Sequence, residues 1–596
     1  MTVDDALRAA AGLFREKTGS VLPYYALVAA TGDVARLPVL IGVIAVYTYL
    51  ASTGRLDLLI DDLAGLNPEL LDPESPAGPG GLPPEIGERL AEILSSPAVV
   101  GPLVGSILVG VVCYVLARGV TRAAALGAVE ASLADDARDP LAAGVDGVGR
   151  WRTFAGLVVV RWGLFVVAGI PVLVALFAGA GTLGTMPESG TTLDQGAVFA
   201  VLAAFAGVLV TVAALVVVLA LLAFVGPAVV VDDVGIRGAV RRSAGVPVAH
   251  PVGFVVYAVV VVACYGVLGV GTVVLGIAGV SRLVALLSAF LLAPLLDSLA
   301  VALYLGWADE RTLDRTDPTD TGAVERSSHD TPADESAFVF GVDPGSENPW
   351  NDPESVRGTV ETEHGSDAAG SDRETTDDGS TPTDGKTTAD RTPTDEGIVS
   401  GVRGAFRGGV AELAGFVRRD WGYVVLAAAV LVVGAAGGWR ATAGYGVQIP
   451  TPDDPGAVFG AVPVGPFVNI AVNNWIVATN AGFSGLFAGL PTVGTLLFNG
   501  LLVGAVAGVV EPLLFVAFVA PHGVIELPAI AVAGGVGLRL GHVAWGAWCG
   551  TRPRSALVGA VGRTWRIAVG LSVVFLVAGF VEAFVTPQVA AWVLGG

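Results

Sequence analysis

Long uninterrupted apolar segments dominate this 596-residue sequence and constrain its fold more than any other feature. Each is long enough, at about 20 residues, for an α-helix to cross the roughly 30 Å hydrocarbon core of a bilayer. Only 15% of the residues are charged, whereas soluble domains carry about 25%. The segments do not alternate apolar and polar residues, which disfavours a transmembrane β-barrel. We therefore predict an all-α, polytopic helical membrane protein.

The predicted spans, about eleven in number, fall into two groups separated by a polar stretch. Six precede it, near residues 37–52, 98–117, 155–178, 198–225, 252–278 and 282–305. Five follow it, near residues 423–439, 466–488, 493–519, 525–549 and 567–585. The sequence thus predicts a six-span module over residues 1–308 and a five-span module over residues 398–596.

The stretch between the modules, residues 309–397, is strongly acidic. From Asp309 to Glu396 it holds 24 acidic and seven basic residues and few apolar ones. Such a segment cannot bury enough surface to offset the entropy of ordering, so we predict a disordered linker. One apolar island, AFVFGVDPGSENPW from Ala337 to Trp350, is either a docking motif or a neutral interruption.

Arginine clusters between the spans predict the orientation. They lie between spans two and three, between spans four and five, before span seven, and between spans ten and eleven. With eleven spans, all four clusters fall on the side that carries the N-terminus. The positive-inside rule therefore places the N-terminus and the linker in the cytoplasm and the C-terminus outside the cytoplasmic membrane.

The composition also bears on origin and partners. The net charge is -21, and all basic residues except Lys17 and Lys386 are arginine. This bias is typical of a halophilic archaeon, although a high-GC genome produces the same preference for arginine. No basic face indicates nucleic-acid binding. The three cysteines form no CxxC pair, so we predict neither a disulfide framework nor a zinc site, and no cofactor.

In the first module, Asp297 is the ionisable residue of most interest. It lies within APLLDSLAVALYLGW, and a carboxylate at membrane depth is either functional or satisfied by a neighbouring helix. The segment FVGPAVVVDDVGIRGAVRRSAGVPVAHPVGF, which links spans four and five, resembles the membrane region found beside some glycerophosphodiester phosphodiesterases. A phosphodiesterase catalytic domain does not accompany it here.

The second module carries polar residues in a distinctive order. They are Asn473-Asn474, Asn499-Gly500, Glu511, Pro521-His522-Gly523 with Glu526, Gly535 with Arg539, and Glu582 followed by Ala583-Phe584. Together they resemble the stage II sporulation protein M family over about residues 401–596. The resemblance implies a membrane unit of five spans. In spore-forming bacteria, members of this family join a membrane complex with peptidoglycan-degrading partners and are not themselves the hydrolase.

His522 and Glu526 are four residues apart, which places them on one face of a helix. We expect them at the outer mouth where span nine turns into span ten, with Glu511 deep in span nine. Pro521 should limit how the helix begins, and Gly523 should let backbones approach.

The remaining polar residues also carry expectations. Arg539 lies about 20 Å further along a straight helix than Glu526, so it must find a partner elsewhere or extend toward the interface. Asn473, Asn474 and Asn499 should bond between helices or line a polar crevice.

Three interpretations of these groups remain open. They hold a compact bundle together, they form a path with Glu511, His522, Glu526 and Glu582 as relay groups, or His522 and Glu526 bind a metal in an intramembrane enzyme. The HExxH motif, which supplies two histidine ligands and a base, is missing, so we predict no metal centre and no catalytic residues.

The resulting hypothesis is a non-enzymatic membrane scaffold or assembly factor. Its second module would dock other membrane or envelope proteins, with the lipid bilayer as its environment; a homo-oligomer is compatible with this role. The alternative is a small-molecule, ion or lipid transporter that uses intramembrane carboxylates. Transport would require an enclosed polar cavity reached by Glu511 and Asp297.

Overall fold

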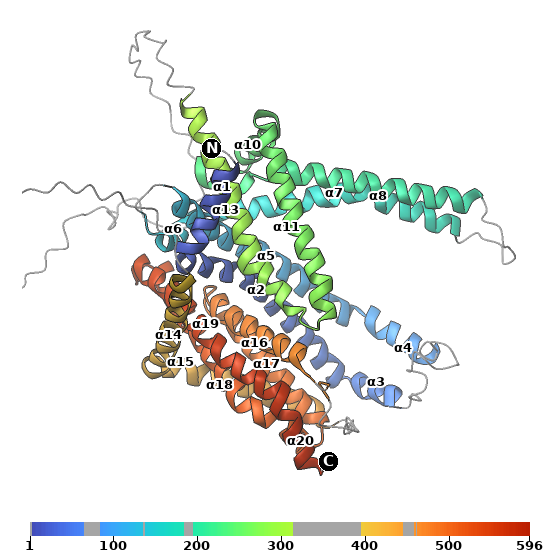
Figure 1. Ribbon diagram of the computed structural model, residues 1–596. Coiled ribbons are helices and arrows are strands. Elements are labelled where there is room, and N and C mark those ends of the chain that lie inside the picture. Colours follow the sequence, from blue (N-terminus) through green and yellow to red (C-terminus); the bar gives the residue numbers. More distant parts are fainter. Residues whose placement is uncertain are drawn as a thin grey trace, which may run out of the picture. The chain divides into compact units, whose positions relative to one another are not determined.

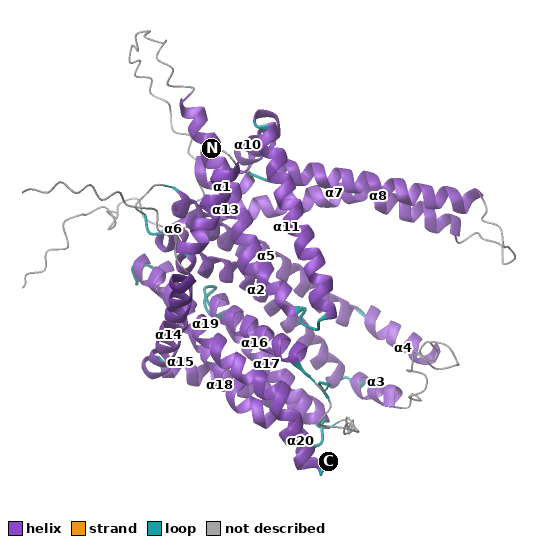
Figure 2. Cartoon of the chain, in the orientation of Figure 1, coloured by secondary structure: helices purple, strands orange, loops and turns teal. Residues whose placement is uncertain are grey.

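The computed structural model describes residues 3–64, 84–134, 138–183, 195–313, 395–444, 458–460 and 462–595. Within these ranges the regular elements are helices and no strand occurs (Figures 1 and 2). One compact unit contains Met1–Arg315 together with Asp395–Gly596. Most of the predicted linker, including the island from Ala337 to Trp350, lies outside the described residues.

The first module is built from helices α1 to α13. They are α1 (Val3–Glu16), α2 (Thr18–Ser52), α3 (Arg55–Ala64), α4 (Pro84–Ser95), α5 (Pro97–Leu133), α6 (Pro140–Gly147), α7 (Trp151–Leu183), α8 (Gln195–Leu222), α9 (Val225–Asp232), α10 (Ile236–Ala249), α11 (Pro251–Ile277), α12 (Arg282–Leu287) and α13 (Ala293–Leu313). A 3₁₀ turn, η2 (Val148–Arg150), precedes α7, and a π-helical turn, η3 (Ser288–Leu292), joins α12 to α13. Proline opens α5, α6 and α11, where its missing N–H costs no helical bond.

The second module contains helices α14 to α20. They are α14 (Asp395–Arg419), α15 (Trp421–Thr442), α16 (Val464–Ser484), α17 (Leu490–Val509), α18 (Pro512–Trp548), α19 (Arg554–Phe580) and α20 (Thr586–Leu594). The π-helical turn η6 (Val581–Val585) joins α19 to α20 without a loop.

Ten helical segments of the described residues are long and apolar enough to cross a membrane. The protein is therefore an all-α, multi-pass membrane protein. Helix α16, predicted as the eighth span, is not among the ten. Its 21 residues span about 31 Å, but four asparagines lower its mean hydropathy. It packs within the bundle against α2, α18 and α19.

The two modules share one hydrophobic core. Phe224 and Tyr304 of the first module belong to the same cluster of buried residues as Phe483 and Leu540 of the second. Phe290 adds a ring contact, with its centroid 5.3 Å from that of Trp475. The modules thus form a single helical bundle within the compact unit.

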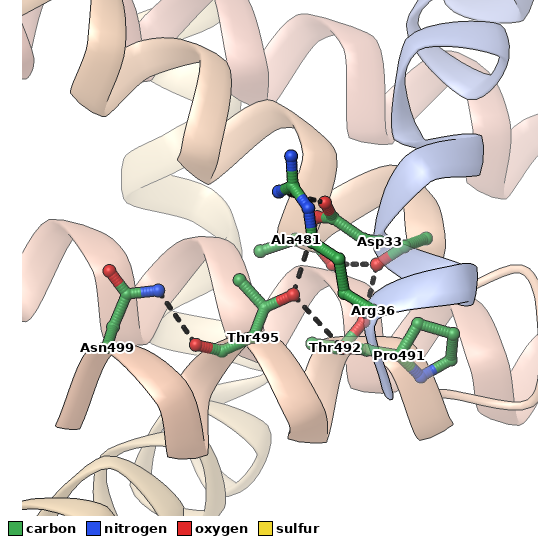
Figure 3. Close-up of polar contacts among 8 residues, drawn as sticks. Asp33, Arg36, Ala481, Pro491, Thr492, Thr495 and Asn499 are labelled. Carbon is green, nitrogen blue, oxygen red and sulfur yellow. Dashed lines mark hydrogen bonds and ion pairs between the residues drawn. The ribbon is translucent and has the colours of Figure 1, made fainter. Parts of the chain in front are cut away.

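Polar contacts also join the modules. Figure 3 shows Asp33 and Arg36 of α2 beside Thr495 of α17. Arg36 donates to Asp33 at 2.8 Å, and the Thr495 hydroxyl donates to the other carboxylate oxygen at 3.4 Å. Asn469 of α16 donates to the carbonyl oxygen of Gly279 at 2.5 Å and accepts from the backbone N–H of Arg282 at 3.0 Å. These bonds pin the turn between α11 and α12 to the second module.

Glycines permit the close approach of helices α15 and α17. A Cβ on Gly434 or Gly438 would overlap the backbone of α17, and a Cβ on Gly500 or Gly504 would overlap the backbone of α15. Small residues at such positions let transmembrane backbones approach closely. Gly500, singled out by the sequence, is therefore a packing residue.

Candidate functional site

Three ionisable side chains converge between α18 and the end of α19. His522 and Glu526 come from α18, and Glu582 comes from η6. One ligand atom from each, the imidazole nitrogen and two carboxylate oxygens, lies within 4.8 Å of the other two. His522 Nε2 is 4.0 Å from Glu582 Oε2. We call these three residues the His–Glu–Glu cluster.

Helix α18 places the cluster away from the mouth that the sequence predicted. The helix begins at Pro512, and Glu511 caps it by accepting a hydrogen bond from the backbone N–H of Leu514 at 2.8 Å. The prediction that Glu511 lies deep in a span was therefore wrong: a proline with no N–H and a capping carboxylate begin a helix there. His522 lies ten residues further, about 15 Å along α18.

Pro521 was predicted to limit the start of a helix, but it lies inside α18, as does Pro528. Each proline lacks an N–H, so the carbonyls of Ala517 and Val524 lose their usual helical donors. Gly523 was predicted to admit another backbone. The atom nearest to a Cβ there is instead Val519 Cγ1 of the same helix, at 3.3 Å.

The π-helical turn η6 carries Glu582, and Thr586, the first residue of α20, carries a hydroxyl that orients the imidazole. Pro587 follows this turn and cannot donate to the carbonyl four residues earlier, so the regular ladder is interrupted. The Thr586 hydroxyl donates to the Val581 carbonyl at 3.1 Å. Its single hydrogen is thereby used, and it accepts from His522 Nδ1 at 3.4 Å. This network assigns the hydrogen to Nδ1 and leaves the Nε2 lone pair facing Glu582.

The cluster combines two carboxylates with a single imidazole. The side chains of His522 and Glu582 are 15% and 22% exposed. Among the described residues, no arginine or lysine forms an ion pair with Glu526 or Glu582. The cluster thus offers one imidazole nitrogen and two carboxylates, a donor set suited to a divalent cation.

Asp297 is satisfied inside the first module. Arg122 of α5 binds it through two nitrogens, at 2.6 and 2.9 Å, and Tyr25 of α2 donates to it at 2.7 Å. The sequence identified Asp297 but gave no sign that Arg122, an arginine assigned to orientation, is its partner. Three helices therefore meet at one partly buried ion pair.

The remaining predicted residues make mostly local contacts. Arg539 finds its partner outside α18, with its Nε 2.9 Å from Asp420 Oδ1. Asn473 donates to its neighbour Asn474 at 3.3 Å, and Asn499 donates to the Thr495 carbonyl of its own helix at 2.7 Å. The described hydrogen bonds of these three asparagines therefore do not cross between helices. Asn469 makes that cross-link instead.

Comparison with known proteins bears on the second module. Residues 423–587 match the family model of Stage II sporulation protein M. The matched range begins in α15, ends in α20 and includes the whole His–Glu–Glu cluster. No curated protein and no solved structure matches the chain. The resemblance of the first module to a phosphodiesterase-associated region stays a prediction.

Proposed function

We propose that this protein is a non-enzymatic membrane scaffold that binds the transmembrane helices of partner proteins. It would lie in the cytoplasmic membrane, with its N-terminus on the cytoplasmic side and its C-terminus outside. The observation that carries the proposal is a glycine-lined face of α11 that nothing in the described structure covers.

Helix α11 is poorly covered by the other described helices. None of its 27 residues is buried. Gly266, Gly269 and Gly276 have nothing within 4 Å of the position where a Cβ would stand. At 100° per residue these three glycines lie within one narrow face of the helix. Thr272 lies on the same face.

The same chain uses glycine faces to bring helices together. In the α15–α17 pair, glycines from each helix meet the backbone of the other. Lipid offers no hydrophobic driving force for association, so close packing and polar contacts decide which transmembrane helices pair. Glycine also destabilises a helix interior by about 1 kcal/mol relative to alanine. We therefore infer that the uncovered glycine face of α11 packs against a helix of a partner protein and not only against lipid.

The polar contacts inside the bundle favour a scaffold over a transporter. Transport would use carboxylates that are free to bind and release a substrate. Glu511 is engaged in a helix cap, and Asp297 is held by Arg122 and Tyr25. Two of the carboxylates that the transport hypothesis invoked are thus committed to structural contacts, whereas Glu526 and Glu582 are paired with no arginine or lysine among the described residues.

Co-purification from native membranes tests the scaffold proposal. Gly269→Leu fills the glycine face without a steric clash inside the chain. Val267, which is 75% exposed, lies on the opposite face, so Val267→Leu is a matched control. We expect a specific set of membrane proteins with wild type and with the control, and its loss with Gly269→Leu. Identical partner sets in both variants would contradict the proposed face.

Reconstitution into liposomes separates the scaffold from the transporter. The scaffold proposal predicts no substrate-dependent flux above that of empty vesicles. Ion or solute flux that depends on the protein and is abolished by Glu526→Gln would instead favour transport.

A further inference from the structure

We propose that the His–Glu–Glu cluster is a binding site for a divalent transition-metal ion of the Zn²⁺ type, which ties α18 to the η6–α20 segment. This inference is independent of the partner-docking role, and its test does not use partner binding. It depends on the geometry of His522, Glu526 and Glu582 and on the hydroxyl of Thr586.

The distances suit an ion better than a direct contact. A separation of 4.0 Å between His522 Nε2 and Glu582 Oε2 is too long for a hydrogen bond. Ligand atoms bound at about 2.1 Å to one zinc ion stand roughly 3.4 Å apart in a tetrahedron. The three ligand atoms, all within 4.8 Å of one another, need to close by at most about 1.4 Å. The terminal torsion of glutamate is broad enough to allow that shift.

The imidazole is already oriented as a ligand. Metal-binding histidines commonly donate their second ring N–H to a nearby oxygen, which fixes the tautomer and the ring plane. Here Nδ1 faces the Thr586 hydroxyl, whose own hydrogen goes to the Val581 carbonyl. The unprotonated Nε2 consequently points its lone pair toward the two carboxylates.

Charge supplies the driving force. Two carboxylates lie beside one imidazole, and because these side chains are only partly exposed, two uncompensated negative charges there are costly. Arg539 on α18 and Asp297 on α13, in contrast, each have a partner of opposite charge. A divalent cation would balance Glu526 and Glu582 and leave room for a further ligand.

The donor set selects the class of metal. Imidazole nitrogen is a good ligand for zinc and other first-row transition ions, whereas Mg²⁺ and Ca²⁺ favour oxygen alone. One nitrogen with two carboxylates therefore points to Zn²⁺ or a related ion. Because the ligands come from two helical segments, binding should stabilise the fold through mass action.

The test measures metal binding by the full chain in nanodiscs. Co²⁺ serves as a spectroscopic probe through its visible absorption, and competition with Zn²⁺ gives the zinc affinity. We expect one ion per chain and a melting temperature raised by Zn²⁺ and lowered again by a chelator. His522→Ala, Glu526→Gln and Glu582→Gln should each weaken binding by more than about 100-fold, because each removes a direct ligand.

Two further variants sharpen the test. Thr586→Val keeps the shape of the side chain but removes the hydroxyl that orients His522. It should weaken binding by about 10- to 100-fold, less than the loss of a ligand. Glu511→Gln alters a carboxylate of the same helix outside the cluster and should leave binding unchanged.

Equal Zn²⁺ affinity in wild type, His522→Ala and Glu582→Gln would overturn the proposal. So would a wild-type protein that binds no Zn²⁺ or Co²⁺, since the cluster would then be a polar His–Glu contact without a metal. Glu582→Gln is isosteric and keeps the test valid if His522→Ala fails to fold. Loss of metal binding with partner binding intact would leave the scaffold proposal standing.

Discussion

Removing the charge of Asp297 should destabilise the bundle strongly if this carboxylate is structural. Asp297 accepts two hydrogen bonds from Arg122 and one from Tyr25. The side chains of Arg122 and Asp297 are only 25% and 19% exposed. Breaking a buried ion pair by removing one partner costs about 3–5 kcal/mol, because the other charge stays buried without compensation. Asp297→Asn should therefore lower the free energy of unfolding by about 3 kcal/mol or more.

A double variant separates this account from a general loss of packing. Replacing both members of a buried pair with apolar residues of similar volume is often close to neutral. We expect Arg122→Met/Asp297→Leu to be within about 2 kcal/mol of wild type, and therefore more stable than Asp297→Asn. Tryptophan fluorescence during unfolding in mixed micelles measures both free energies. A cost below about 1 kcal/mol for Asp297→Asn would refute the structural assignment.

Two more predictions concern helix packing and the joining of the modules. Gly500→Val should drive its side chain into the backbone of α15 and cost about 3 kcal/mol in unfolding free energy, whereas Gly437→Val, with open space around it, should cost about 0.5 kcal/mol or less. Asn469→Leu removes two hydrogen bonds between the modules and should cost about 1–3 kcal/mol; Asn499→Leu, which loses a bond within its own helix, should cost less. Unfolding titrations check both pairs, and equal effects within either pair would contradict the structure.

The apolar segments predicted the helices well because a bilayer leaves the backbone few alternatives. Every N–H and C=O in the hydrocarbon must be paired within the protein, so long apolar runs become helices. Helix ends were harder to predict. The apolar run continues on both sides of Glu511 and Pro512, so the predicted ninth span, residues 493–519, runs through the point where α17 ends and α18 begins. The useful signal there was the capping carboxylate followed by proline.

The candidate site could be predicted only in part. The spacing of His522 and Glu526 correctly places both on one face of α18. Glu582 joins them from another helical segment, and no spacing rule reports which helices pack together. Because sequence spacing does not report which helices pack together, it could not identify Arg122 as the partner of Asp297, nor predict that the two modules are in contact. Their shared core depends on contacts between residues hundreds of positions apart.

Photo-crosslinking in native membranes tests the central claim, that α11 receives a partner helix, most directly. A photoreactive amino acid would replace Gly269 on the glycine face of α11 in one protein and Val267 on its opposite face in another. We expect Gly269 to give a discrete crosslinked product that contains a second membrane protein and Val267 to give none. Crosslinks to lipid alone at both positions would contradict the scaffold account.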